Sequence, residues 1–261
     1  MHNGHYPPPK LHAPLHARAR DSLVARLEGM QEQDPDEEFD FLFPLQADGT
    51  RRSRPRLFDG SYLEDGDYVY GTGAFIGNAE ALTTEDKRKF LAAFHLVRSY
   101  GEVSLHRLHN FYFFTRNSRI IIFAPDRDDR LLFYRRDAPA DFDVSGEEFN
   151  LITLPENNPG RITRCTELRP IVYDTTNRTW TTGCQTPVDV NGVHIGNFGT
   201  SILLSELFGK AIDDHITGAE NMIITADGHL IAHPTLTRYG EETARYLNIE
   251  ASDHTRLKNT W

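Results

Sequence analysis

The dipeptide Asn191-Gly192 constrains the fold of this chain more than any other feature. It separates two long segments, TWTTGCQTPVDV and VHIGNFGTSILL, that are rich in β-branched and aromatic residues. Asn-Gly is the strongest short-range signal for a two-residue hairpin turn, because both residues accept positive φ. A long antiparallel hairpin is therefore expected on either side of residue 191.

Other strands are expected on both sides of this hairpin. FYFFTRNSRIIIFAP indicates a second hairpin, whereas DYVYGTGAFIG, LLFYRR and RPIVYD indicate single strands. The turn Thr176-Asn177 joins RPIVYD to the long hairpin. The chain thus contains enough strand segments for an antiparallel sheet.

Helical signals are clearest at two places. Thr83 or Thr84, followed by acidic residues, predicts a helix start, and Tyr100-Gly101 predicts its end. A short helix is expected at 145–154, and another begins near Leu203.

The N-terminal third predicts a leader, a helix and loops. Residues 1–12 are rich in proline and histidine and predict a disordered leader, and residues 13–34 predict a stalk helix. The helix carries its apolar stripe at Leu15, Ala19, Leu23, Leu27 and Met30. The acidic stretch EQDPDEEFD is interpreted as a solvated linker, and RRSRPRLFDG as a loop.

Composition excludes several function classes. The chain has 261 residues and a formal net charge of −10, so a nucleic-acid backbone would be repelled. No apolar run approaches the roughly 20 residues that span a bilayer. The motifs G-x-S-x-G, H-E-x-x-H and the P-loop are absent, and no cofactor is expected.

The stretch DGHLIAHP at 227–234 has three interpretations: a metal site, a catalytic histidine pair, or a hairpin. Its Asp-Gly dipeptide favours the hairpin. Along a strand, His229 and His233 would be roughly 13 Å apart, too far to share one ion. We therefore expect no metal site and no catalytic residues there.

Four stretches together resemble one family of sensor domains. They are FFTRNSRIIIFAP, NNPGRITRCTELRPIVYDTTNRTW, TTGCQTPVDVNGVHIGNFGTSILLSEL and DGHLIAHP, and in this order they resemble the double Cache family. That resemblance implies an α+β fold of tandem PAS-like antiparallel sheets with flanking helices on a long N-terminal helix. It also implies a membrane-distal subdomain at 35–217, which binds the ligand, and a truncated membrane-proximal subdomain at 218–261.

The resemblance further implies a function. Such modules are non-catalytic, extracytoplasmic (periplasmic) input domains of inner-membrane receptors, with a histidine kinase of a two-component system, a diguanylate cyclase or a chemotaxis output. The intact receptor would dimerise in parallel through the N-terminal helix, and membrane segments would flank the domain. Two alternatives are a small hydrolase-type enzyme and a purely structural dimerisation module.

The ligand-binding residues expected from this resemblance lie on the covering loop and on the strands that follow it. Arg161 and Arg164 in the loop 157–166 could bind a carboxylate or phosphate, or could instead pair with Glu156 or Glu167. The remaining candidates, which could equally be core or turn residues, are Cys165, Tyr173, Asp174, Trp180, Cys184 and Ser201.

Two departures from the family pattern bear on the ligand. Family members that bind amino acids carry Arg-x-Trp in the covering loop and an aspartate in the last strand, whereas this chain has Thr163-Arg164-Cys165 and Ser201. A small polar or anionic metabolite is therefore expected, and a free α-amino acid is not. If the domain is periplasmic, Cys165 and Cys184 could form a disulfide.

Overall fold

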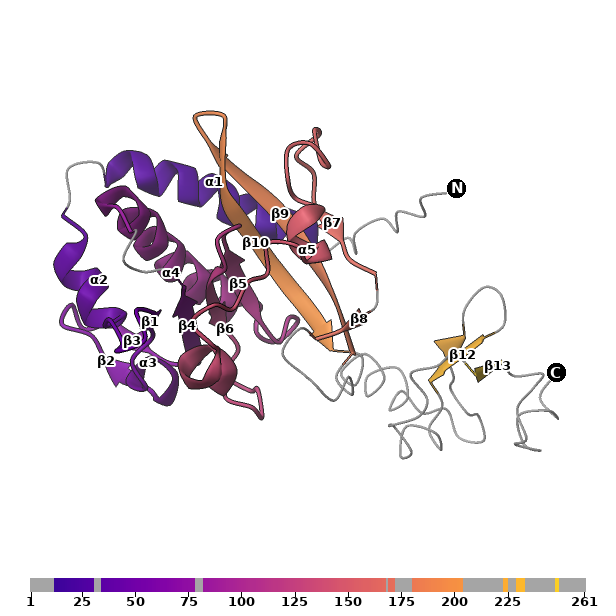
Figure 1. Cartoon of the computed structure of the whole chain (residues 1–261), viewed down its shortest axis with the longest axis horizontal. Helices are drawn as coiled ribbons and strands as arrows, with labels where there is room; N and C mark the ends of the chain where they lie inside the picture. Colours follow the sequence, from indigo (N-terminus) through magenta and orange to yellow (C-terminus); the bar gives the residue numbers. More distant parts are fainter. Residues whose placement is uncertain are drawn as a thin grey trace. The chain divides into compact units, whose positions relative to one another are not determined.

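The computed structural model describes residues 12–30, 34–77, 82–167, 169–171, 180–203, 223–224, 229–232 and 247–248. The chain divides into two compact units (Figure 1). The first comprises Met1–Glu167 and Gly183–Ser201, and the second Leu168–Thr182 and Ile202–Trp261. Within the described residues, no helix is both long and apolar enough to cross a membrane.

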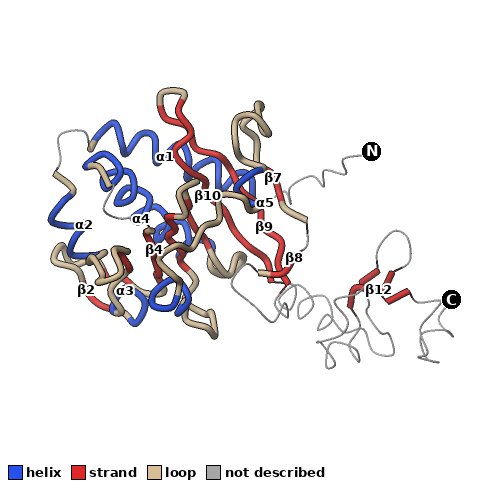
Figure 2. The backbone as a smooth tube through the Cα atoms, in the orientation of Figure 1, coloured by secondary structure: helices blue, strands red, loops and turns tan. Residues whose placement is uncertain are grey.

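An antiparallel sheet forms the centre of the first unit (Figure 2). Its strands run in the order β1-β4-β6-β5-β10-β9-β7. Their bounds are Arg51–Arg52 for β1, Thr72–Ile76 for β4, Phe111–Phe114 for β5, Arg119–Phe123 for β6, Arg164–Cys165 for β7, Trp180–Val190 for β9 and Val193–Leu203 for β10.

Both predicted hairpins of the first unit are confirmed. Asn191 and Gly192 turn β9 into β10 with φ of 51° and 77°, the positive values that this turn requires. In the shorter hairpin, β5 pairs with β6 so that Phe114 lies opposite Ile120. The sequence therefore determines the register of the sheet mainly through its turns.

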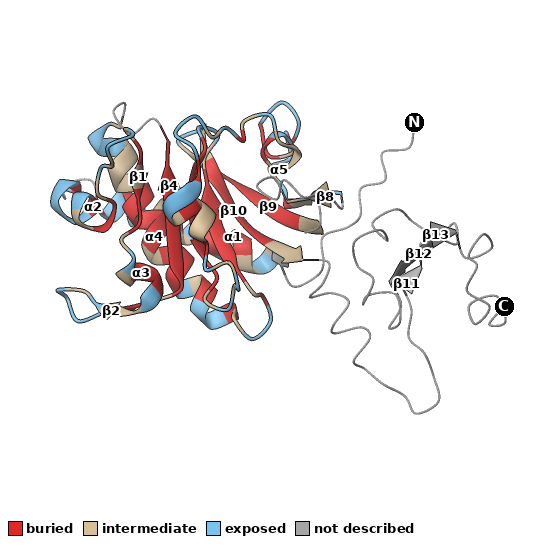
Figure 3. Cartoon of the chain, turned by 60° about the horizontal axis from the view of Figure 1, so that its bottom comes forward, coloured by how far each residue is buried: buried red, intermediate tan, exposed pale blue. Residues whose placement is uncertain are grey.

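Two long helices cover one face of the sheet: α1 (His12–Gly29) and α4 (Thr84–Ser104). Alternate strand residues such as Phe111, Phe113 and Phe198 join the same buried core as the helix residues (Figure 3). The apolar stripe predicted for the stalk helix lies inside this core at Leu23 and Leu27, because α1 packs on α4.

Helix α4 begins as predicted but continues past its expected end. Thr83 and Asp86 form a reciprocal capping box at its start. The helix runs through Gly101 to Ser104. A Cβ atom at position 101 would lie 2.4 Å from the Phe123 ring, so this glycine serves close helix–sheet packing and does not end the helix.

Three predicted segments differ in the structure. The acidic stretch expected to be a linker contains α2 (Asp36–Leu42), whose Phe39 and Leu42, three residues apart, bury one helix face. The expected strand LLFYRR instead contains a π-helical turn, η2 (Phe133–Asp137). The loop RRSRPRLFDG contains β1 and a short helix, α3 (Arg56–Asp59).

The opposite face of the sheet is covered by the chain between β6 and β7. Phe142, after η2, packs on Phe75 with ring centroids 5.8 Å apart. Phe149 of α5 (Glu148–Leu151) packs on Phe114 at 5.1 Å. A small hairpin of β2 (Ser61–Tyr62) and β3 (Tyr68–Val69) lies elsewhere in this unit.

Short strands are described in the second unit. β8 (Arg169–Pro170) pairs with the start of β9. β11 (Ile223–Ile224), β12 (His229–Ala232) and β13 (Leu247–Asn248) form an antiparallel sheet. The pairing of β11 with β12 confirms the hairpin interpretation of DGHLIAHP.

Candidate functional site

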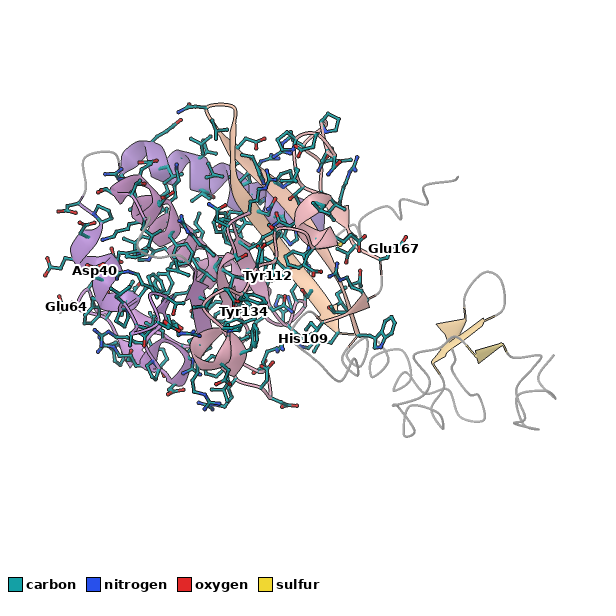
Figure 4. The ribbon with its side chains drawn as sticks, in the orientation of Figure 1. Asp40, Glu64, His109, Tyr112, Tyr134 and Glu167 are labelled. Atoms are coloured by element: carbon teal, nitrogen blue, oxygen red, sulfur yellow. A yellow bond between two sulfur atoms is a disulfide. The ribbon has the colours of Figure 1, made fainter. Side chains whose placement is uncertain are left out.

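A buried tyrosine marks the candidate site on the face of the sheet away from α1 and α4. Tyr112 alternates along β5 with the core residues Phe111 and Phe113, so its side chain points to the other face. Figure 4 shows it in the interior of the first unit, whereas Asp40 and Glu64 lie at the rim.

Two glycines make room for the Tyr112 side chain. Gly199 lies opposite Tyr112 in the β5–β10 ladder, and a Cβ atom there would be 2.4 Å from the tyrosine ring. A Cβ atom at Gly183 of β9 would lie 3.0 Å from the tyrosine hydroxyl. The bare backbone of these strands therefore forms the surface on which the ring lies.

The Tyr112 hydroxyl is the centre of a polar cluster. The Gln185 side chain donates from Nε2 to this hydroxyl at 2.9 Å, and the Ser201 hydroxyl lies 3.2 Å from it. Because the Ser201 hydroxyl donates to the Tyr112 hydroxyl, the hydrogen of the Tyr112 hydroxyl remains for a further acceptor. Gln185 Oε1 is buried and has no partner among the described residues. The cluster thus retains one unused donor and one unused acceptor.

The cluster is held in place and kept neutral. Asn110 accepts from Ser201 N and donates to Ser201 O, both at 2.7 Å, which fixes the β10 end of the cluster. Burial raises the pKa of Tyr112 to about 12, and its hydrogen bonds to Ser201 and Gln185 offset only part of that effect. Tyr112 therefore remains a neutral phenol that can donate a hydrogen bond.

Arg161 of the covering loop is already engaged by protein groups. Its guanidinium forms a two-pronged ion pair with Asp189 at 2.5 and 2.6 Å. It also donates to Thr153 O at 2.5 Å and lies 2.8 Å from His194 Nδ1. Arg161 thus forms an ion pair, which was one of its two interpretations. Its partner, however, is Asp189 and not Glu156 or Glu167.

Arg164 is better placed for a ligand. It lies opposite Gln185 in the β7–β9 ladder, so the two side chains share a face of the sheet. Its Nη1 donates to Asn157 O at 2.7 Å, while its Nε is buried without a partner in the described part of the chain. A guanidinium with unused donors beside the cluster can bind an anionic group.

The other residues expected at the site do not lie at the Tyr112 cluster as ligand contacts or lie outside the described residues. Cys165 and Cys184 form the expected disulfide, 19 residues apart in sequence, which ties β7 to β9. Trp180 lies at the start of β9 in the second unit, opposite Pro170. Tyr173 and Asp174 lie outside the described residues.

The sequence also contained signals for two residues that were not singled out. Tyr112 is the polar-tipped aromatic in the strand FYFF, and Gln185 is a polar residue within the buried run of β9. A buried polar side chain in a strand requires a partner, and this requirement could have indicated both. No three His, Cys, Asp or Glu side chains in the described ranges gather as metal ligands would.

Comparisons with known proteins give structural matches only. No protein-family model matches the sequence. No curated protein matches it either. The chain is similar to the ligand-binding domain of the Pseudomonas fluorescens chemoreceptor CtaA in complex with L-serine, with 16% identity, a TM-score of 0.37, and coverage of 56% of each chain. It therefore spans little more than half of that domain.

Two further matches are of the same kind. One is the ligand-binding domain of the Pseudomonas aeruginosa amino acid chemoreceptor PctC in complex with GABA, with 14% identity, a TM-score of 0.30, and coverage of 54% of this chain and 55% of that one. The other is the sensory domain of the Campylobacter jejuni chemoreceptor Tlp3, with 11% identity, a TM-score of 0.39, and coverage of 88% and 75%.

Proposed function

We propose that this chain is a non-catalytic, small-molecule-sensing input domain of a bacterial transmembrane receptor, and that its ligand binds at the Tyr112–Gln185–Ser201 cluster. The observation that supports this most is the pair of unused hydrogen-bonding groups in the cluster, one donor and one acceptor. Buried polar groups are normally satisfied, so unused ones mark a place where a polar ligand would be stabilised.

The proposed ligand is a small polar or anionic metabolite. Arg164 supplies a cationic group on the same face as Gln185, which suits a carboxylate or phosphate. An α-amino acid would also bring an ammonium group, which needs an anionic partner when it is desolvated. Asp189 is already paired with Arg161, and Ser201 offers only a hydroxyl. A free α-amino acid is therefore disfavoured.

The remaining parts of the proposal concern the receptor. The domain is extracytoplasmic, it is joined to membrane segments outside this chain, and it belongs to a homodimer through α1. Leu23 is buried against α4, so the dimer contact uses the exposed positions of the helix, such as Arg18, Ala25 and Glu28. The output is a kinase, a cyclase or a chemotaxis domain, and the proposed subdomain boundaries are 35–217 and 218–261.

Calorimetry on the whole chain tests the ligand site. The panel contains dicarboxylates, aromatic acids and phosphorylated metabolites, with L-serine for comparison. The variants are Arg164→Ala, Gln185→Leu and Tyr112→Phe. Each removes one charge-assisted or buried hydrogen bond, a loss of roughly 1–3 kcal/mol, so affinity should fall about ten- to a hundred-fold.

Arg107→Ala is the matched control, because Arg107 is exposed three residues beyond the end of α4 and is not part of the cluster. It should bind like the unaltered chain. A ligand that binds all four variants with equal affinity would place the site elsewhere. Micromolar binding of L-serine, unchanged by Arg164→Ala, would show that the proposed ligand class is wrong.

A further inference from the structure

A second, separate feature of the first unit lies at a surface hollow of about 460 Å³, lined by Phe41, Arg54, Pro55 and Arg56. Sites for small molecules typically have volumes of about 300–1,000 Å³, so the hollow has the size of a ligand site. None of its residues belongs to the Tyr112 cluster. The hollow is therefore a separate candidate binding site.

Phe41 holds two guanidinium groups at this hollow. The Arg54 and Arg56 guanidinium carbons lie 5.2 and 4.3 Å from the centre of its ring, within cation–π range. Arg54 is also anchored to the end of α2, because its backbone N–H donates to Leu42 O and its Nε donates to Phe41 O. Both positive charges thus lie next to the same aromatic ring.

These two arginines differ from their neighbours in having no carboxylate partner in the described part of the chain. Arg51 pairs with Asp40, and both Arg130 and Arg135 pair with Asp59. Arg54 and Arg56 form no such ion pair, and the Arg56 Nε is buried without a hydrogen-bond partner. In a chain of net charge −10, this leaves a local concentration of unneutralised positive charge.

Packing alone does not account for this arrangement. Stacking on Phe41 explains where the guanidinium carbons lie, but most of their N–H groups have no acceptor among the described residues. Guanidinium groups match the oxygen atoms of carboxylates and phosphates, which would neutralise both charges at once. Pro55 and the edge of Phe41 provide an apolar wall next to them.

We propose that this hollow binds a small organic anion, with its carboxylate or phosphate group between Arg54 and Arg56 and its apolar part against Pro55. This ligand is distinct from the one bound at the Tyr112 cluster. The guanidinium of Arg56 makes no hydrogen bond to a described residue, so its replacement removes ligand contacts with little effect on the fold.

The test is a titration of the whole chain with phenyl phosphate, followed by NMR through the amide signals of residues 54 and 56–58. Phenol, which has the ring without the charge, is the matched probe. Saturable shifts are expected with phenyl phosphate and none with phenol. Arg56→Gln should weaken binding at least tenfold, because one charge-assisted contact is lost. Arg56→Lys keeps the charge without the planar fork, so it should bind less tightly than the unaltered chain, and it replaces the glutamine variant if that variant does not fold.

A control variant separates this site from other arginines. Arg116→Gln changes an exposed arginine in the β5–β6 turn and should leave the response of the amides of residues 54 and 56–58 to phenyl phosphate unchanged. The proposal is overturned if phenol binds as well as phenyl phosphate, if no amide of residues 54 and 56–58 shifts, or if Arg116→Gln weakens binding as much as Arg56→Gln.

Discussion

The substitution Gly101→Ala tests how closely α4 packs on the sheet. Replacing glycine by alanine within a helix normally stabilises it by about 1 kcal/mol, because alanine loses less backbone entropy on folding. At this position the new methyl group would lie 2.4, 2.8 and 3.0 Å from Cδ1, Cγ and Cβ of Phe123. Those atoms are near the backbone of a fully buried strand residue, so they cannot move aside freely.

The neighbours of Phe123 also restrict its rotation. The Tyr70 ring packs on its ring edge to face, with centroids 5.4 Å apart. Overpacking of this kind costs about 1–3 kcal/mol, and the clash is shorter than any real Cβ contact. We therefore expect the cost to exceed the gain in helix propensity, so that Gly101→Ala lowers the free energy of unfolding by up to about 2 kcal/mol.

Gly29→Ala is the matched control, because Gly29 ends α1 and a Cβ atom there meets nothing within 4 Å. It should be neutral or stabilise the protein by up to about 1 kcal/mol. Urea unfolding followed by circular dichroism compares the two midpoints at an unchanged slope. If Gly101→Ala stabilises the protein as much as Gly29→Ala does, the close packing inferred for α4 is incorrect.

The remaining predictions concern the disulfide and the pH dependence of stability. Reducing the Cys165–Cys184 disulfide should lower the free energy of unfolding by roughly 3 kcal/mol, as measured by urea unfolding with and without reductant. Two alkylated thiols in unreduced protein would contradict this disulfide. Burial, reinforced by the charge of Arg161, lowers the pKa of His194, so the unfolded chain binds more protons than the folded one near the ordinary value of 6.5. Stability should therefore decrease as pH falls through this range and level off below the folded pKa, and His194→Gln should flatten the decrease. The Arg161 guanidinium lowers the pKa of Asp189, so a second loss should follow below 3.8.

Local sequence signals predicted the parts of the fold that depend on turns and caps. The Asn191-Gly192 turn and the capping box at Thr83 were evident in the sequence because neighbouring residues determine them. The acidic segment containing α2 was misinterpreted, since its charges suggested solvent exposure. Phe39 in that helix is nevertheless fully buried, and its contact with Phe90 of α4 comes from the tertiary structure.

The candidate site was predictable only in part, for a related reason. Ser201 and Arg164 were expected at the site because they lie on segments that resemble a known sensor family. Tyr112 and Gln185 contact each other across 73 residues of sequence, and no local pattern reports such a pair. For Arg161 the sequence left a ligand contact and an ion pair open, and its partner Asp189 lies 28 residues further along the chain, beyond the reach of local patterns.

The covering loop 157–166 is held by contacts of several kinds. Arg161 joins it to Asp189 near the β9–β10 turn, and the disulfide joins it to the middle of β9. Between these points, the hydroxyls of Thr163 and Thr186 lie 2.6 Å apart in a buried hydrogen bond. A segment fixed in this way does not have to be ordered when a ligand binds, and ordering would otherwise cost about 0.5–1.5 kcal/mol for each immobilised side chain. If the ligand binds at the Tyr112 cluster, its affinity should then depend on its own polar contacts, which is why single substitutions at Arg164, Gln185 and Tyr112 are expected to have large effects.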